Sequence, residues 1–197
     1  MGCCPHFFWL CASHTIFIAG APESHNIQAA LASGLLRRIP SIPLGVFLRH
    51  DCLGRPLAFS EEGGQLQVGI SFSRHSGWLW GAAAQTIGLG IDVSGPEEFL
   101  SPYPDARVFT VDELGAAAKF VGSLPEARAL LWGLKEAAAK ALGTGFNKVE
   151  PSELTIRDWQ PLEGQKITCR VDSPFGGFDA LTGLVCGFRV AVATRIF

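Results

Sequence analysis

The segment between residues 125 and 142 constrains the fold of this chain more than any other part of the sequence. It is rich in alanine and leucine, which lose little conformational freedom in an α-helix. Gly143 follows directly, where a helix end favours a residue that adopts positive φ without strain. The pattern predicts one long helix over residues 125–142, around which the other elements have to be arranged.

One face of this predicted helix carries chemically active groups. Residues four apart lie on the same helical face, so Trp132, Glu136 and Lys140 form a single row. The opposite side is apolar and consists of Leu131, Leu134, Ala138, Ala141 and Leu142. We expect the apolar side to pack in a core and the polar row to remain free for chemistry.

A second segment places an acid at the end of an apolar strand. Residues 81–85 and 87–93 read as two adjacent short strands with a turn near Thr86, and the second ends at Asp92. Singly, Asp92 reads as a turn or cap residue, and Glu136 with Lys140 as a helix salt bridge that contributes roughly 0.2–0.5 kcal/mol. Together, two carboxylates are the ligands that Mg²⁺ takes in addition to phosphate oxygens and water. The combination indicates a magnesium-pyrophosphate site.

Four motifs occur in an order that resembles the 4′-phosphopantetheinyl transferase superfamily, in its long single-chain form. The two signature motifs are Gly-Ile-Asp-Val at residues 90–93 and the Trp-x-x-Lys-Glu-x-x-x-Lys pattern at residues 132–140. Upstream, Gly-Arg-Pro at residues 54–56 resembles a family turn, and residues 70–77 resemble a family strand that ends in Ser-His-Ser. Each motif alone is weak, whereas the ordered set is specific.

The resemblance implies an α+β fold made of two similar α/β halves related by a pseudo-twofold axis. On this basis we divide the chain into residues 1–93 and 94–197, which form one compact unit with coenzyme A in the cleft between them. The remaining predicted elements are strands at 7–11, 16–19, 42–48, 68–72, 78–85, 153–156, 166–171 and 180–193, and helices at 23–38 and 111–119.

The resemblance also implies a reaction. Such enzymes move the phosphopantetheine arm of coenzyme A to a serine of an acyl, polyketide or peptidyl carrier protein, and release 3′,5′-ADP. Asp92 and Glu136 would bind Mg²⁺, with Ser94 or a water as a further ligand. Glu136 would also take the serine proton, and Lys140 would meet phosphate charge. The residues expected to bind coenzyme A are His75, Arg55, Arg74, Ser76, Arg37, Lys135 and Lys140.

The chain departs from the family pattern at several positions. Many long members carry a second acid two residues after the strand aspartate, where this chain has Ser94. Glu97 and Glu98 lie nearby in the sequence, and Arg74 replaces a serine before the motif histidine. No lysine or arginine precedes residue 25, so later arginines would have to hold the 3′-phosphate.

Two other functions remain open on the sequence. One is a non-catalytic homologue that binds carrier protein or coenzyme A, which the departures above favour. The other is a different Mg²⁺-dependent nucleotide enzyme, such as a pyrophosphohydrolase, that shares only the acid pair. The glycine-rich residues 143–148 follow the predicted helix, whereas a phosphate-binding loop precedes one. They are therefore interpreted as a helix end and turn in preference to a phosphate loop.

Composition narrows the class of protein. A hydrophobic content of 48% with 17% charged residues predicts a folded domain, and a net charge of −2 argues against a nucleic-acid surface. The apolar start lacks a basic region and is interrupted at Ser13 and His14, so we expect no membrane segment. The six cysteines show no metal-ligand spacing, which favours reduced thiols in a cytoplasmic protein. Because the chain is long enough for both halves, we expect it to form its cleft as a monomer.

Overall fold

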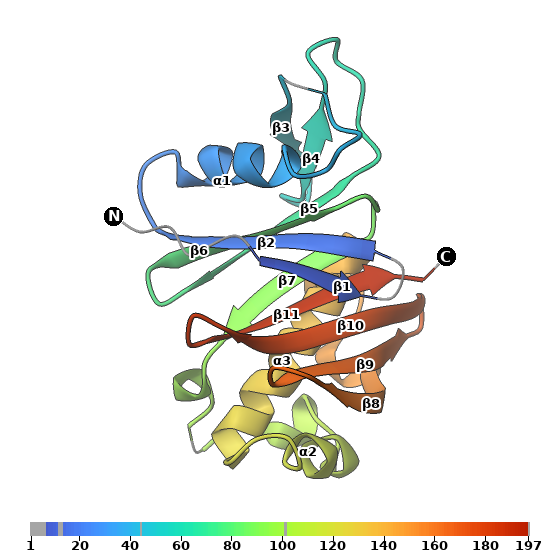
Figure 1. Cartoon of the computed structure of the whole chain (residues 1–197). Helices are drawn as coiled ribbons and strands as arrows, with labels where there is room; N and C mark the ends of the chain where they lie inside the picture. The colour runs from blue at the N-terminus through green and yellow to red at the C-terminus, as the bar shows by residue number, and fades with distance from the viewer. Residues whose placement is uncertain (1–6, 12–13, 44, 101, 197) are drawn as a thin grey trace.

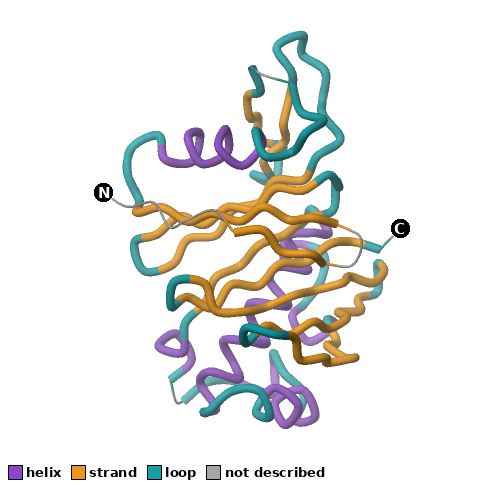
Figure 2. The backbone as a smooth tube through the Cα atoms, in the orientation of Figure 1, coloured by secondary structure: helices purple, strands orange, loops and turns teal. Residues whose placement is uncertain are grey.

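The computed structural model describes residues 7–11, 14–43, 45–100 and 102–196. They form two antiparallel sheets, a separate hairpin and three α-helices (Figure 1, Figure 2). The first sheet has the order β1-β2-β6-β5, and the second has the order β7-β11-β10-β9-β8. This mixture of helices and antiparallel strands confirms the predicted α+β class.

The bounds of the elements are as follows. The first sheet and the hairpin contain β1 (Phe7–Cys11), β2 (His14–Pro22), β3 (Phe47–His50), β4 (Pro56–Phe59), β5 (Gly69–His75) and β6 (Trp78–Ala84). The second sheet contains β7 (Leu89–Ser94), β8 (Thr155–Leu162), β9 (Lys166–Ser173), β10 (Gly176–Val185) and β11 (Phe188–Arg195). The helices are α1 (Ile27–Leu36), α2 (Val111–Ala117) and α3 (Leu124–Leu142). Among the described residues, no helix is both long and apolar enough to cross a membrane.

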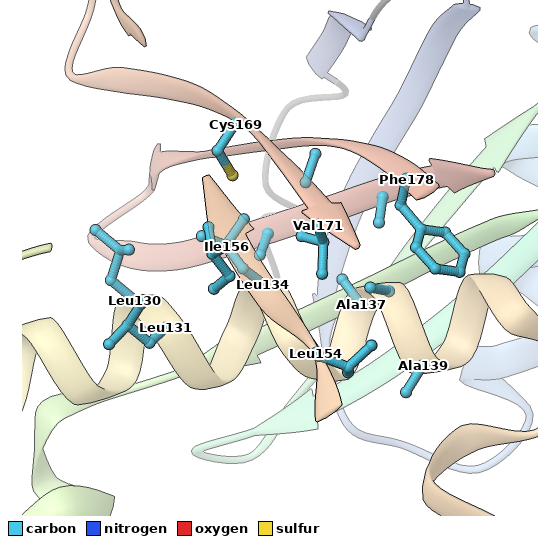
Figure 3. Close-up of a cluster of buried hydrophobic side chains, with 14 of the residues drawn as sticks. Leu130, Leu131, Leu134, Ala137, Ala139, Leu154, Ile156, Cys169, Val171 and Phe178 are labelled. Carbon is cyan, nitrogen blue, oxygen red and sulfur yellow. The ribbon is translucent and has the colours of Figure 1, made fainter. Parts of the chain in front are cut away.

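Three apolar clusters hold these elements in layers. One cluster lies between α1 and the first sheet and includes Leu31, Leu35 and Leu79. A second joins the two sheets and includes Trp80 from β6 and Ile91 from β7. The third packs α3 against the second sheet (Figure 3). The order of layers is therefore α1, first sheet, second sheet, α3 (Figure 1).

The long helix α3 forms where the alanine-rich pattern predicts it. Ser123 accepts a hydrogen bond from the Glu126 backbone nitrogen at the start of the helix, and Gly143 ends it with φ 88°. Leu131 and Leu134 are completely buried on its apolar face, which confirms the predicted division of the helix into a packed side and a polar row. The core of the second half is built on this face.

Helix α3 lies unusually close to β7 at Gly90. A Cβ atom at this position would overlap the Ala137 carbonyl oxygen and would lie 2.7 Å from the Ala141 backbone nitrogen. Only a residue without a side chain fits there. This close approach brings the polar row of α3 next to the end of β7, and it thereby sets the position of Glu136 and Lys140 relative to Asp92.

The two sheets also meet along one edge of each. β5 is the last strand of the first sheet and β7 is the outer strand of the second. The Ser71 hydroxyl accepts a hydrogen bond from the Ile91 nitrogen at 3.2 Å, and the Ser73 hydroxyl accepts one from the Val93 nitrogen at the same distance. Side-chain hydroxyls thus take the place of a backbone ladder across this joint.

Several predicted boundaries need correction. The predicted strand at 42–48 is wrong for the described residues before Phe47, where β3 begins, because Pro43 and Gly45, with φ 81°, interrupt the segment. The predicted strand at 180–193 is two strands, β10 and β11, joined by a turn at Cys186 and Gly187 with φ 50° and 83°. The hairpin strand β4 lies between residues 48 and 68, where no strand was predicted.

The division of the chain after residue 93 stays a prediction. β7 pairs with β11 in the second sheet and not with β6, its neighbour along the chain. Residues 85–88 therefore join the last strand of the first sheet to the first strand of the second. In each half the first long strand pairs with the last one, as β2 does with β6 and β7 does with β11. A pseudo-twofold relation between the halves stays a prediction.

The described cysteines are free thiols, and the two predicted N-terminal strands at 7–11 and 16–19 are confirmed. β1 pairs with β2 in antiparallel register, with Trp9 opposite Ile16. The cysteines of the described residues divide into two buried and two exposed, namely Cys11 and Cys169 against Cys52 and Cys186. Cys3 and Cys4 lie outside the described residues.

Candidate active site between the two halves

Asp92 and Glu136 both form an ion pair with the side chain of Lys140. The Lys140 Nζ donates to Asp92 Oδ1 at 2.9 Å and lies 3.1 Å from Glu136 Oε1. It also donates to the Ile91 carbonyl at 3.1 Å. A single ammonium group therefore connects the acid at the end of β7 with the acid on α3. This arrangement agrees with the prediction that these residues lie together.

Burial makes Asp92 an unusual carboxylate. Its side chain is only 5% exposed. The pKa of Asp92 is raised to about 6, mainly by burial and also by the charge of Glu136, against the opposing effects of Lys140 and the Ser73 hydroxyl. For Lys140, burial lowers the pKa, but Asp92 and Glu136 outweigh it and the net shift is upward. The positive charge of Lys140 therefore stabilises the ionised form of Asp92, and the two acids stabilise the protonated form of Lys140.

The acid pair lines a small polar cavity of about 280 Å³. Ser73 donates to Asp92 Oδ1 at 2.8 Å, whereas Asp92 Oδ2 accepts no hydrogen bond from the described part of the chain. The Ser94 hydroxyl also lines the cavity and donates to the Ala129 carbonyl at 2.9 Å. The other residues of the wall are Phe72, Arg74, Val93, Glu98, Trp132, Glu136 and Lys140.

A second cavity of about 350 Å³ adjoins the first, and Phe72, Arg74 and Lys140 line both. Its wall comes from both halves of the chain, and half of the residues in it are polar or basic. Its other polar and basic residues include Gln28, His50, Arg55, Thr144 and Asn147. The two cavities together form a cleft between the halves, with Lys140 at the point where they meet.

Arg55 and Arg74 lie in this cleft as predicted. The Arg55 Nη2 donates to the Ile87 carbonyl at 2.6 Å, which holds the guanidinium beside the end of α3. The Arg74 Nε pairs with Glu23 at 3.0 Å and its side chain is 63% exposed. Both arginines are therefore available at the wall of the larger cavity.

His75 and Ser76 are not among the residues that line the two cavities. The His75 Nε2 lies 2.9 Å from Glu97 Oε1, and its Nδ1 lies 3.0 Å from Glu98 Oε1. Ser76 forms the exposed β5–β6 turn with φ 48°. The predicted contact of His75 with a phosphate requires the ring to leave one of these two carboxylates.

Two predicted binding residues lie elsewhere. Lys135 is completely buried, and its Nζ donates to Glu113 Oε2 at 3.0 Å and to the Val108 and Pro151 carbonyls. It anchors the loops around α3 and cannot reach the cleft, so its assignment to coenzyme A binding is corrected. Arg37 lines a different cavity beyond α1, next to Pro43, and does not reach the cleft either.

Several polar residues of the cleft are not among the predicted site residues, and Gln28, His50 and Asn147 are three of them. Gln28 and His50 contact each other through Nε2 atoms 3.3 Å apart, and Asn147 lies in the turn after α3. The sequence indicates two of them only by their closeness to other motifs. His50 lies four residues before the Gly-Arg-Pro turn at residues 54–56, and Asn147 belongs to the glycine-rich segment at residues 143–148. Glu98 was noted only as a neighbour of Asp92 in the sequence, and the structure places it in the wall of the smaller cavity.

Comparison with known proteins identifies the family. A family model for the 4′-phosphopantetheinyl transferase superfamily matches residues 88–187, just over half of the chain. The match begins at the residue before β7 and contains Asp92, Glu136 and Lys140. A search of curated proteins gave no match. From the family match we conclude that this chain belongs to the 4′-phosphopantetheinyl transferase superfamily.

Proposed function

We propose that this protein transfers the 4′-phosphopantetheine arm of coenzyme A to a serine of an apo carrier protein, in a Mg²⁺-dependent reaction. The strongest support is the carboxylate pair Asp92 and Glu136, joined by Lys140 at the meeting point of two cavities. Membership of the superfamily supports the same class of reaction. We infer an acyl, polyketide or peptidyl carrier as the partner and a cytoplasmic monomer as the working form.

The donor set of the smaller cavity fits Mg²⁺. Asp92 Oδ2 has no hydrogen-bond donor among the described residues, and Asp92 and Glu136 together carry more negative charge than Lys140 balances. Hard oxygen donors of this kind suit a small divalent cation. Asp92 and Glu136, with the Ser94 hydroxyl or a water, would hold the ion, which when bound would act as a Lewis acid toward the pyrophosphate oxygens.

Lys140 would contribute positive charge at the phosphates. Its ammonium lies in the wall common to both cavities and is 25% exposed, so a phosphate oxygen can reach it from the larger cavity. Arg55 and Arg74 line the same cavity and would bind the nucleotide end of coenzyme A. Charge neutralisation and positioning are the main demands of phosphoryl-type transfer.

Glu136 is better suited than Asp92 to accept the serine proton. Its side chain is 29% exposed, whereas that of Asp92 is 5% exposed. In the transfer, the serine oxygen would bond to the phosphorus that carries the pantetheine arm, and the bond from that phosphorus to the oxygen of the ADP part would break. The proton would pass to Glu136, directly or through a water, and 3′,5′-ADP would leave with the electron pair.

Mass spectrometry of the acceptor tests this proposal. The protein is incubated with coenzyme A, Mg²⁺ and apo carriers of the acyl, polyketide and peptidyl types, and the expected product is a carrier heavier by one phosphopantetheine arm. Asp92→Ala and Glu136→Ala should abolish the mass gain while circular dichroism remains unchanged. Glu163→Ala is the matched control, because this exposed acid lies in the β8–β9 turn. The absence of a mass gain with every carrier would contradict the proposal.

A second candidate function is binding without transfer. Two observations favour it. His75 contacts the carboxylates of Glu97 and Glu98, so its ring is not free for a phosphate, and Ser94 stands where many members of the family have an acid. Titration calorimetry with coenzyme A distinguishes the two. Saturable binding of coenzyme A or of an apo carrier, with no product in the mass assay, would favour the non-catalytic homologue.

A further inference from the structure

A buried hydroxyl of the first half contacts the acid pair of the second. Ser73 lies on β5 and is 7% exposed, and its hydroxyl donates to Asp92 Oδ1 at 2.8 Å. The same oxygen of Ser73 accepts a hydrogen bond from the Val93 nitrogen at 3.2 Å. One side chain of the first sheet thus bridges the backbone of β7 and the carboxylate that β7 carries.

The contacts of Asp92 leave a single carboxylate oxygen for a ligand. Oδ1 accepts from Ser73 and also from Lys140 Nζ, the latter at 2.9 Å. Oδ2 accepts no hydrogen bond from the described residues, and a Cβ atom added to the facing Gly133 would still lie 3.8 Å from it. Oδ2 is therefore the oxygen that Asp92 can offer to an ion in the smaller cavity.

Lys140 alone does not fix the plane of this carboxylate. An ammonium group is a compact charge with three rotatable donors, and Lys140 also contacts Glu136 at 3.1 Å and the Ile91 carbonyl. The Ser73 hydroxyl approaches from the neighbouring strand and is itself held by the Val93 amide. It therefore supplies the directional contact that distinguishes Oδ1 from Oδ2.

We propose that Ser73 is a positioning residue of the metal site, because its hydroxyl holds Asp92 Oδ1 and thereby directs Oδ2 to the ion. This inference rests on the proposed function and adds a residue that does not itself touch the ion. It also makes the orientation of a metal ligand in the second half depend on a side chain of the first. Hydrogen-bond partners of metal ligands commonly have this role, and their loss weakens metal binding about 10- to 100-fold.

Ser71 provides a matched control for Ser73. It lies two residues earlier on the same face of β5, is 6% exposed, and accepts a hydrogen bond from the Ile91 nitrogen at the same 3.2 Å. It lines the larger cavity and not the smaller one, and in the described part of the chain no hydrogen bond joins it to Asp92 or Glu136. Ser71→Ala and Ser73→Ala therefore each leave one β7 amide without its acceptor, but only the second releases Asp92.

Binding of Mn²⁺ to the full-length protein without coenzyme A, followed by the electron paramagnetic resonance signal of the free ion, tests the proposal. Ser73→Ala should weaken Mn²⁺ binding about tenfold, and Ser71→Ala should change it less than about twofold. Both variants should unfold at somewhat lower urea concentrations than the wild type, because each leaves a buried amide unpaired. Equal losses of Mn²⁺ affinity in the two variants, or no loss in Ser73→Ala, would overturn the proposal.

A second pair of variants separates the hydroxyl from the volume of the side chain. Ser73→Thr and Ser73→Val add nearly the same bulk at a strand position, and only threonine keeps a donor for Asp92 Oδ1. Ser73→Thr should bind Mn²⁺ about tenfold more tightly than Ser73→Val, whereas a purely structural role would affect both alike. Equal affinities in these two variants would show that the hydroxyl does not orient the carboxylate.

The same titrations separate this inference from the proposed function. If the wild-type protein transfers phosphopantetheine while Ser73→Ala binds Mn²⁺ as the wild type does, the inference fails and the function stands. If the wild-type protein binds Mn²⁺ and Ser73→Ala loses it selectively, but no carrier is modified, the function fails and the positioning role stands. Absence of Mn²⁺ binding to the wild type would contradict the positioning role of Ser73.

Discussion

Replacement of Gly90 by alanine should separate α3 from β7 and thereby disturb the carboxylate pair. The added methyl group would overlap the Ala137 carbonyl oxygen and lie 2.7 Å from the Ala141 nitrogen. Both neighbours are backbone atoms of one helical turn, so no side-chain rotation can relieve the contact. Overpacking of this kind costs about 1–3 kcal/mol, and we expect a value near the upper end because the helix has to move as a unit.

The displacement should also weaken metal binding. Lys140 lies between the two crowded residues of α3, and its 2.9 Å contact with Asp92 spans the same gap between helix and strand. We therefore expect a lower urea midpoint and weaker Mn²⁺ binding in Gly90→Ala. Effects on both measurements would show that one contact sets both the packing and the site.

Gly115 supplies the control for this experiment. It lies within α2, is exposed, and has no atom within 4 Å of the position that a Cβ would take. Gly115→Ala should raise the free energy of unfolding by about 0.5–1 kcal/mol, as expected for alanine in a helix. If Gly90→Ala unfolds at the same urea concentration as the wild type and binds Mn²⁺ equally well, the close approach of α3 and β7 does not constrain the site.

Three further perturbations have defined outcomes. Lys135→Met should lower the free energy of unfolding by about 3–5 kcal/mol in a urea titration, because it leaves the buried Glu113 without its cation; a wild-type midpoint would contradict the anchoring role. Since the pKa of Asp92 is about 6, Mn²⁺ affinity without coenzyme A should fall about tenfold from pH 7 to pH 5 as the carboxylate is protonated; a flat profile would mean an ordinary aspartate pKa. Arg55→Ala should weaken coenzyme A binding in calorimetry, with Arg37→Ala as a control that leaves binding unchanged.

The sequence predicted those helices and strands that are determined by the pattern of neighbouring residues. The period of α3, its glycine end and the position of Asp92 at the end of an apolar strand all follow from neighbouring residues. The placement of Lys135 shows where motif reasoning failed. It lies four residues from Leu131 and three from Ala138, so the helical period puts it on the packed face, and only the resemblance suggested a phosphate contact.

The contacts that the sequence did not reveal join segments far apart in the chain. Lys135 is tolerated in the core because Glu113, from α2, compensates its charge, and no local pattern announces that partner. The pairing of β7 with β11 brings together residues about a hundred positions apart, and no pattern within either segment indicates that they belong to one sheet. Long-range pairing of this kind depends on the packing of the whole domain and not on periodicity.

The joint between β5 and β7 has a consequence for the solubility of the protein. Exposed strand edges carry unpaired backbone groups and attract strands of other chains. Here each of the two edges shields the other, and the hydroxyls of Ser71 and Ser73 satisfy the amides that a ladder would otherwise pair. A chain cut at residues 85–88 would uncover both edges at once. The two halves therefore protect each other from aggregation through the same joint that positions Asp92 for chemistry.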